Sequence, residues 1–220
     1  MSDRGVVSDP TLPVYGVAEY MTAGPYRQLQ VLAEYKFPKL GIRASYYKEA
    51  RGAIRRFHEA REDRGIIGAA VTALQNRLER PLKDYERVRV QHNVRVLGSY
   101  VRYRADVHYE VKPIAWSRMM IRGVTVHTNP DLLVVDEGKL KLIKFDFGER
   151  PPKDRFAGIV AEALHRGAQE AKTGVEASGV VFYSIEADRE WAANPSAQRW
   201  RNIVAACRII ATLWPSVKPE

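Results

Sequence analysis

Three charged residues near the middle of the chain have the types and spacing that could bind a metal ion and act on phosphate esters. Asp131 begins one β-rich run, and Lys144 and Asp146 lie near the end of the next. Residues two apart on a strand share a face, so Lys144 and Asp146 are expected to project to the same side. A tight turn near residue 137 pairs positions whose numbers sum to about 274–276, which places Asp131 beside Lys144 and near Asp146.

Two carboxylates and a lysine suit metal-dependent hydrolysis of a phosphodiester. Carboxylate oxygens hold Mg²⁺ or Mn²⁺, the metal lowers the pKa of its bound water, and a lysine stabilises negative charge or positions the nucleophile. We therefore expect Asp131 and Asp146 to be catalytic metal ligands, assisted by Lys144. The alternative interpretation is that Lys144 and Asp146 are solvated charges on the exposed face of a hairpin.

The runs that carry these residues predict a β-hairpin. Residues 132–135 and 140–147 are rich in β-branched and apolar residues, and Asp136-Glu137-Gly138 between them has the composition of a tight turn. Helical periodicity over residues 43–80 predicts two helices with a break near residue 63. Period-two alternation predicts antiparallel strands over residues 88–96 and 103–111, and a further strand over 119–127.

The rest of the chain predicts a helix over residues 155–172, a buried strand over 179–185 and a last helix over 196–213. Repeated prolines predict that residues 1–42 form an irregular segment, with short helical pieces, packed on the main body. Residues 43–220 are then expected to form a single domain of mixed α+β or α/β class.

With this arrangement the sequence resembles the PD-(D/E)xK, or restriction-endonuclease-like, superfamily, especially its RecB-type branch. Proteins of this superfamily carry Pro-Asp at the start of one strand and acid-x-Lys at the end of the next. Pro130-Asp131 matches the first element, Lys144-Phe145-Asp146 lies at the position of the second, and Gly148 follows it. The resemblance covers about residues 43–185 and implies a nuclease-like domain with a central mixed sheet flanked by helices.

The triplet departs from that superfamily because its acid and lysine are exchanged. A metal ligand moved by two residues shifts by about 6.5 Å along a strand. Two interpretations therefore stay open. The protein is either an active nuclease with a rearranged site or a catalytically inactive relative that binds nucleic acid or a partner protein. The resemblance also implies a further acid from the first helices, for which the candidates are Glu59, Glu62 and Glu79. Glu62 is preferred as the fourth catalytic residue because it ends a predicted helix near the strands.

The charge balance favours a polyanionic partner. The chain has 35 Lys and Arg against 26 Asp and Glu, a net charge of +9, and such an excess attracts polyanions by counterion release. We expect nucleic acid, DNA in preference to RNA, with a protein partner or a homo-oligomer as further possibilities. The expected contacts are the arginines of the predicted strands, interleaved with tyrosines: Arg87, Arg89, Arg95, Arg102, Arg104, Arg118 and Arg122.

Several classes of protein are disfavoured. Cys207 is the single cysteine, so neither an intramolecular disulfide nor a cysteine-based metal cluster is expected, which suits a reducing compartment. The first residues are too polar for a signal peptide, and no run of 18 apolar residues occurs. The sequence therefore predicts a cytoplasmic protein that is not embedded in a membrane.

Overall fold

A computed structural model describes residues 6–38, 46–114 and 118–219, and it is a mixed α/β protein. Its seven α-helices in these ranges are α1 (Val14–Thr22), α2 (Pro25–Lys36), α4 (Lys48–Glu59), α5 (Arg64–Leu78), α6 (Asp84–Arg104), α7 (Asp154–Glu170) and α8 (Ala197–Leu213). Its strands are β1 (Thr11–Pro13), β2 (Glu110–Lys112), β3 (Arg118–Ile121), β4 (Val124–His127), β5 (Leu132–Asp136), β6 (Lys139–Asp146), β7 (Val180–Ser184) and β8 (Arg189–Ala192).

The larger sheet has five strands in the order β2-β5-β6-β7-β8, in which only β6 and β7 run parallel. The smaller sheet has the order β1-β4-β3. The predicted hairpin is confirmed as β5 and β6. Leu132 lies opposite Ile143, so paired positions sum to 275, within the expected interval.

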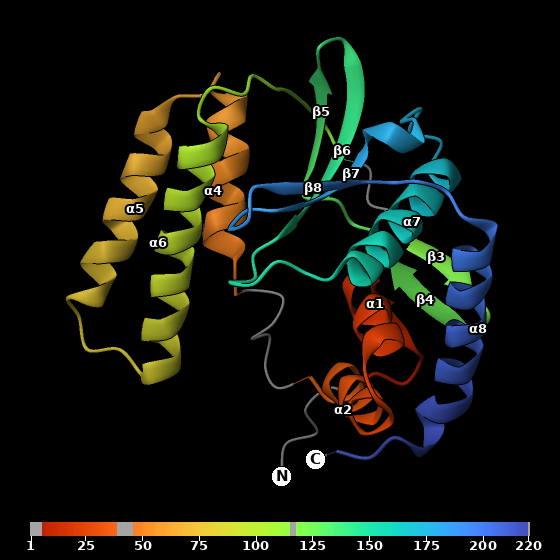
Figure 1. The fold of residues 1–220 in the computed structure, drawn as a ribbon. Coiled ribbons are helices and arrows are strands. Elements are labelled where there is room, and N and C mark those ends of the chain that lie inside the picture. The colour runs from red at the N-terminus through yellow and green to blue at the C-terminus, as the bar shows by residue number, and fades with distance from the viewer. Residues whose placement is uncertain (1–5, 39–45, 115–117, 220) are drawn as a thin grey trace.

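Helices cover both faces of the five-stranded sheet (Figure 1), with α4, α5 and α6 on one side and α7, α1 and α8 on the other. The side chains of β6 alternate between two apolar cores. Ile143 and Phe145 belong to the core under α4 to α6, whereas Leu142 belongs to the core with α7. This alternation fixes which face Lys144 and Asp146 share, because a one-residue slip would reverse every side chain.

The predicted strands at 88–96 and most of 103–111 are wrong, because residues 84–104 form the single helix α6 and only Glu110–Lys112 is a strand. The side chains of Val90, Asn93, Leu97 and Tyr100 are buried, at helical spacing. A strand would have buried Val88 with Val90, but Val88 is 42% exposed.

Other differences lie near the N-terminus and in the smaller sheet. The described part of residues 1–42 contains β1, α1 and α2, which is more regular structure than the prolines predict, because Pro25 is the first residue of α2. The strand expected over 119–127 is a hairpin of β3 and β4. Arg122 and Gly123 turn it with φ of 49° and 85°.

The remaining elements follow the prediction. The two helices expected within 43–80 are α4 and α5, although residues 43–45 lie outside the described part of the chain. The helices expected at 155–172 and 196–213 are α7 and α8, and the buried strand at 179–185 is β7.

Candidate functional site

Asp131 lies directly before β5 and is held by three groups. Its side chain is 3% exposed, its Oδ2 accepts the backbone N–H of Phe145 at 2.8 Å, and Lys144 Nζ donates to Oδ1 at 3.2 Å. Arg51 of α4 forms an ion pair with the same carboxylate, with Nε 2.5 Å from Oδ1. The predicted contact between Asp131 and Lys144 is confirmed, and one buried carboxylate faces two cations.

Asp146 ends β6 on the side of α1 and α7. It is buried, lies opposite Ser184 of β7 in the parallel register, and its Oδ1 accepts the Tyr15 hydroxyl at 3.1 Å. Burial raises the pKa of the Asp146 carboxyl, and the hydrogen bond from Tyr15 only partly opposes this. The same contact and burial raise the pKa of the Tyr15 hydroxyl well above its ordinary value.

Two aromatic rings, those of Tyr47 and Phe147, pack beside Arg51, the ion-pair partner of Asp131 from α4. The guanidinium of Arg51 lies 5.3 Å from the centre of the Phe147 ring, and Tyr47 stacks on that ring at 4.8 Å with an interplanar angle of 14°. Stacking over an aromatic face fixes the guanidinium in place. Arg51 is therefore positioned both by its ion pair with Asp131 and by its contact with the Phe147 ring.

A divalent metal does not fit this set of donors. Mg²⁺ binds where carboxylate oxygens are free to coordinate it and where their charge is not already balanced. Arg51 and Lys144 balance Asp131, and Asp146 is a buried acid with a raised pKa. In the described ranges, three or more His, Cys, Asp or Glu side chains do not come together in a group that could hold a metal ion.

Glu62 does not join Asp131 and Asp146. It lies between α4 and α5, where its carboxylate accepts hydrogen bonds from His58 Nδ1 and His108 Nδ1, both at 3.0 Å, and from the backbone N–H of Tyr109 at 3.1 Å. These donors connect the turn between α4 and α5 to the residues just before β2. Strand β2 begins opposite Val135, at the end of β5 that is far from Asp131. Glu62 is thus placed to fix this corner of the fold.

We expect Glu62→Ala to lower the free energy of unfolding by about 2–3 kcal/mol at pH 7, because it leaves the donors of the buried His58 and Tyr109 without their acceptor. Burial opposes ionisation, but the hydrogen bonds from His108, His58 and Tyr109 outweigh it and lower the pKa of Glu62. A lowered pKa contributes stability above the ordinary value, near 4.3, that is lost as the pH falls through the folded value. Urea unfolding should therefore show the difference from wild type shrinking at acidic pH.

Glu59→Ala is the matched control. Glu59 is 44% exposed and, among the residues that the structure describes, pairs only with Arg55 across one helical turn, so its removal should change stability by less than about 0.5 kcal/mol. Equal losses in the two variants would contradict the structural role given to Glu62.

The seven arginines expected to bind nucleic acid do not share one surface. Five lie on α6, whereas Arg118 is on β3 and Arg122 is in the turn after it. Arg95 pairs with Glu149 and Glu186, and Arg104 pairs with Asp188 and Glu190. The expectation that the arginines from Arg87 to Arg104 lie on strands is wrong, because residues 84–104 form the helix α6, and their binding of nucleic acid stays a prediction. The exposed members are Arg87, Arg102, Arg118 and Arg122.

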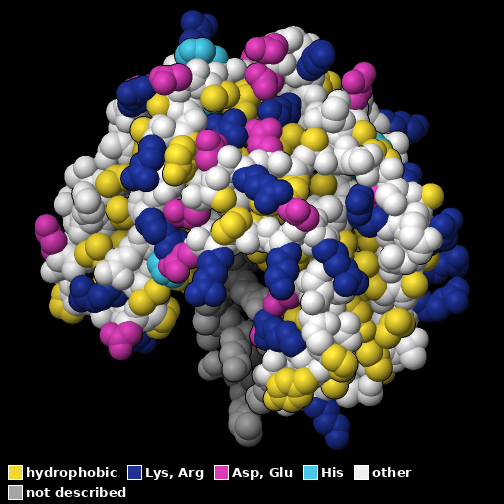
Figure 2. Space-filling model, in the orientation of Figure 1, with side chains coloured by type: hydrophobic (Ala, Val, Ile, Leu, Met, Phe, Trp, Pro, Cys, Tyr) yellow, Lys and Arg dark blue, Asp and Glu magenta, His cyan; other side chains and the backbone are white. Residues whose placement is uncertain are grey.

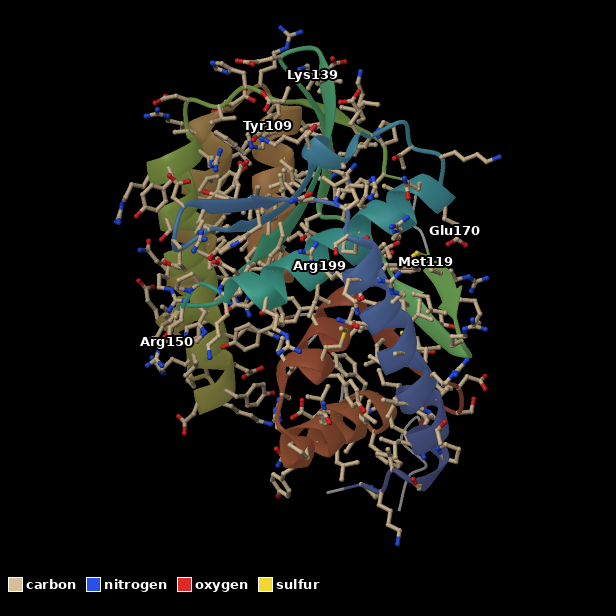
Figure 3. All side chains as sticks on the ribbon, turned by 45° about the vertical axis from the view of Figure 1, so that its right-hand side comes forward. Tyr109, Met119, Lys139, Arg150, Glu170 and Arg199 are labelled. Carbon is tan, nitrogen blue, oxygen red and sulfur yellow. The ribbon has the colours of Figure 1, made fainter. Side chains whose placement is uncertain are left out.

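A more concentrated group of cations follows β6, in the connection to α7 and in the first turn of that helix. Arg150, Lys153 and Arg155 are exposed and form no ion pair within the described residues. The two acids of the same stretch are paired with distant arginines: Glu149 with Arg95 of α6, and Asp154 with Arg189 of β8. Figure 2 shows Lys and Arg side chains gathered across the middle of one face, and Figure 3 shows Arg150 ahead of the start of α7. We call Arg150, Lys153 and Arg155 the basic connection.

Sequence reasoning missed Arg51 and Tyr15, which contact the two carboxylates. Both come from helices far from the hairpin along the chain, so no local spacing indicates them. The cations of the basic connection can be found in the sequence, in the run Glu149-Arg-Pro-Pro-Lys-Asp-Arg155. That the two acids of this run form ion pairs with distant arginines is seen only in the structure.

Comparison with known proteins adds no family to this geometry: no protein-family model matches the chain, and no curated protein matches it. Among the described residues, no helix is both long and apolar enough to cross a membrane.

Proposed function

We propose that this chain is a non-catalytic protein with a restriction-endonuclease-like core that binds nucleic acid, with DNA as the expected ligand. The supporting features of the core are a hairpin that starts at Asp131, a parallel strand beside β6, and helices on both faces of the sheet. Of the two interpretations of the sequence, we thus favour the catalytically inactive relative over the metal-dependent nuclease.

One observation carries the non-catalytic part: Asp131 is paired with both Arg51 and Lys144. In a phosphodiester hydrolase that uses a metal, this carboxylate would bind the ion and help to lower the pKa of water. Here, two cations occupy its negative charge, and truncating one partner of such a buried pair is costly. The ion pairs therefore act to stabilise the end of the hairpin.

Nucleic-acid binding is supported by charge and by its position. The net charge is +9, and the three cations of the basic connection lie directly after the strand that ends in Asp146. Exposed Lys and Arg without acidic partners release counterions from nucleic acid most effectively.

The test is fluorescence anisotropy with a labelled 20-base DNA and its RNA counterpart, each single-stranded and double-stranded, over a range of KCl concentrations. We expect the logarithm of the association constant to fall linearly with the logarithm of the KCl concentration, with a slope of about −2 or steeper. Affinity that is undetectable at 50 mM KCl for every probe would overturn the proposal and favour a protein partner.

A further inference from the structure

A cavity of about 280 Å³ lies between the end of α1 and the first turns of α7 and α8. Its charged lining residues are Asp154 and Arg155 of α7 and Arg199 of α8. Figure 3 shows Arg199 where the beginning of α8 meets α7. The volume is near the lower end of the range for small-molecule sites, about 300–1,000 Å³, so the cavity suits one nucleotide-sized group and not a duplex.

Arg199 is held in place by the backbone around it. Its Nη1 donates to the carbonyl of Asn194 at 2.9 Å, and it lies 3.5 Å from Oε2 of the fully buried Glu162. Gly158 of α7 lies against the guanidinium, where a Cβ would be in van der Waals contact with Arg199 Nε at 3.4 Å. A guanidinium fixed in this way loses little side-chain entropy when it binds an anion.

Two acids bear on the charge of the cavity: Asp154, which is part of its lining, and the buried Glu162 behind Arg199. Asp154 accepts a hydrogen bond from Arg189 at 2.8 Å. Glu162 receives Arg166 Nε at 3.1 Å on one oxygen and the backbone N–H of Ser196 at 2.8 Å on the other, both nearer than Arg199. The two arginines of the lining outnumber its one acid, Asp154, and that acid is paired with Arg189 outside the lining.

The rest of the lining combines polar and apolar groups. Ser196 contributes a hydroxyl, and Gln198 and Asn202, which are hydrogen-bonded to each other at 2.9 Å, contribute amides. Met21 and Ile159 supply apolar surface. Such a lining matches a ligand with a charged end and a less polar, hydrogen-bonding body, because a few polar groups fix orientation while apolar contacts supply area.

We propose that this cavity binds the phosphate monoester of a nucleotide-sized group, with Arg155 and Arg199 as the charged contacts. Arginine suits this ligand because its planar fork matches phosphate oxygens in pairs. Arg155 also belongs to the basic connection, so the cavity lies beside the proposed nucleic-acid surface. As a subsite for a phosphorylated strand end the inference rests on the proposed function, and a free mononucleotide offers the same chemistry.

The test is calorimetric titration of the full chain with adenosine 5′-monophosphate, with adenosine as the uncharged comparison. We expect the monophosphate to bind and adenosine not to bind. Arg155→Gln and Arg199→Gln should each weaken binding about tenfold, because each removes a charged hydrogen bond. Arg208→Gln, which changes an exposed arginine on α8 outside the cavity, should leave the affinity unchanged.

Arg155 is exposed, so Arg155→Gln remains decisive even if Arg199→Gln disturbs Glu162 and fails to fold. No binding of the monophosphate, or binding unchanged by Arg155→Gln, overturns the inference. A second titration compares one labelled oligonucleotide with and without a 5′-phosphate. Tighter binding of the phosphorylated strand by wild type, lost in Arg155→Gln, supports a strand end as the source of the phosphate.

The two proposals fail in different ways. If oligonucleotides bind and the monophosphate does not, the cavity inference is wrong and the proposed function stands. If the monophosphate binds in an Arg155-dependent way and neither oligonucleotide binds, the cavity takes a free nucleotide and the proposed function is wrong.

Discussion

Asp131→Asn is expected to lower the free energy of unfolding by about 3 kcal/mol at pH 7. Asp131 is 3% exposed, and losing its charge leaves Lys144, at 17% exposed, facing a neutral amide. Removing one partner of a buried ion pair costs about 3–5 kcal/mol. The lower end applies here because Arg51 is 37% exposed and solvent can take up part of its charge.

Asp146→Asn is the matched contrast, two positions past Lys144 on the same strand. Burial raises the pKa of Asp146, so its ionised form opposes folding. For a carboxyl with a raised pKa, stability is greatest below the unfolded value, near 3.9, and is lost as the pH rises through the folded value. The asparagine variant lacks this loss, and Tyr15 can still donate to its amide oxygen. We expect its stability at pH 7 to equal or exceed that of wild type.

Urea unfolding of the two variants at pH 7, followed by far-UV circular dichroism, measures this contrast. A stable Asp131→Asn protein beside a destabilised Asp146→Asn protein would contradict the assignment of the ion pairs. It would instead indicate a strained carboxylate at Asp131, as expected of a site that awaits a metal.

Arg150→Gln together with Lys153→Gln is expected to weaken DNA binding about 60-fold in 0.1 M KCl. Each phosphate contact contributes a salt-dependent factor of about 8 at this concentration, so two lost contacts multiply to that value. The slope of log affinity against log salt should also become shallower by about 2. Both residues are exposed and unpaired within the described ranges, so the protein should stay folded.

The control removes two cations of the same kind elsewhere. Arg56 of α4 and Arg80, after α5, are exposed. Changing both to Gln lowers the net charge equally, so it should reduce affinity only slightly through the general field. If both double variants lose the same affinity, the binding surface is not the basic connection.

The hairpin and its register could be predicted because strong local signals agree there. Two β-rich runs flank a turn at Gly138, whose φ of 78° favours glycine, and this turn dictates the pairing of Asp131 with Lys144. Helices α7 and α8 were equally readable, since each has one apolar stripe and a clear end.

The error in α6 arose because its sequence carries two periods at once. Valines alternate with arginines as in a strand, but burial follows the spacing of Val90, Asn93, Leu97 and Tyr100. A tertiary contact of Asn93 favours the helical period: its side-chain oxygen accepts the backbone N–H of Ala50 at 3.0 Å and so connects α6 to α4. A contact between helices that are distant along the chain cannot be seen in a window of sequence.

The candidate site was predicted only in part for the same reason. The hairpin placed Asp131, Lys144 and Asp146, but Arg51 and Tyr15 reach them from α4 and α1. Glu62 lies toward the turn end of the hairpin, away from Asp131, because α4 runs away from Asp131 after Arg51. The arginine and the tyrosine make the two carboxylates members of ion-paired and hydrogen-bonded clusters, which the spacing of the hairpin alone does not indicate.

The most direct test of the non-catalytic assignment measures binding and chain length in one sample. Labelled DNA is incubated with a saturating amount of protein in 10 mM Mg²⁺ or Mn²⁺, its anisotropy is read, and the same sample is run on a denaturing gel. The account predicts bound DNA of unchanged length in both metals. Metal-dependent shorter products that disappear with Asp131→Asn would contradict it.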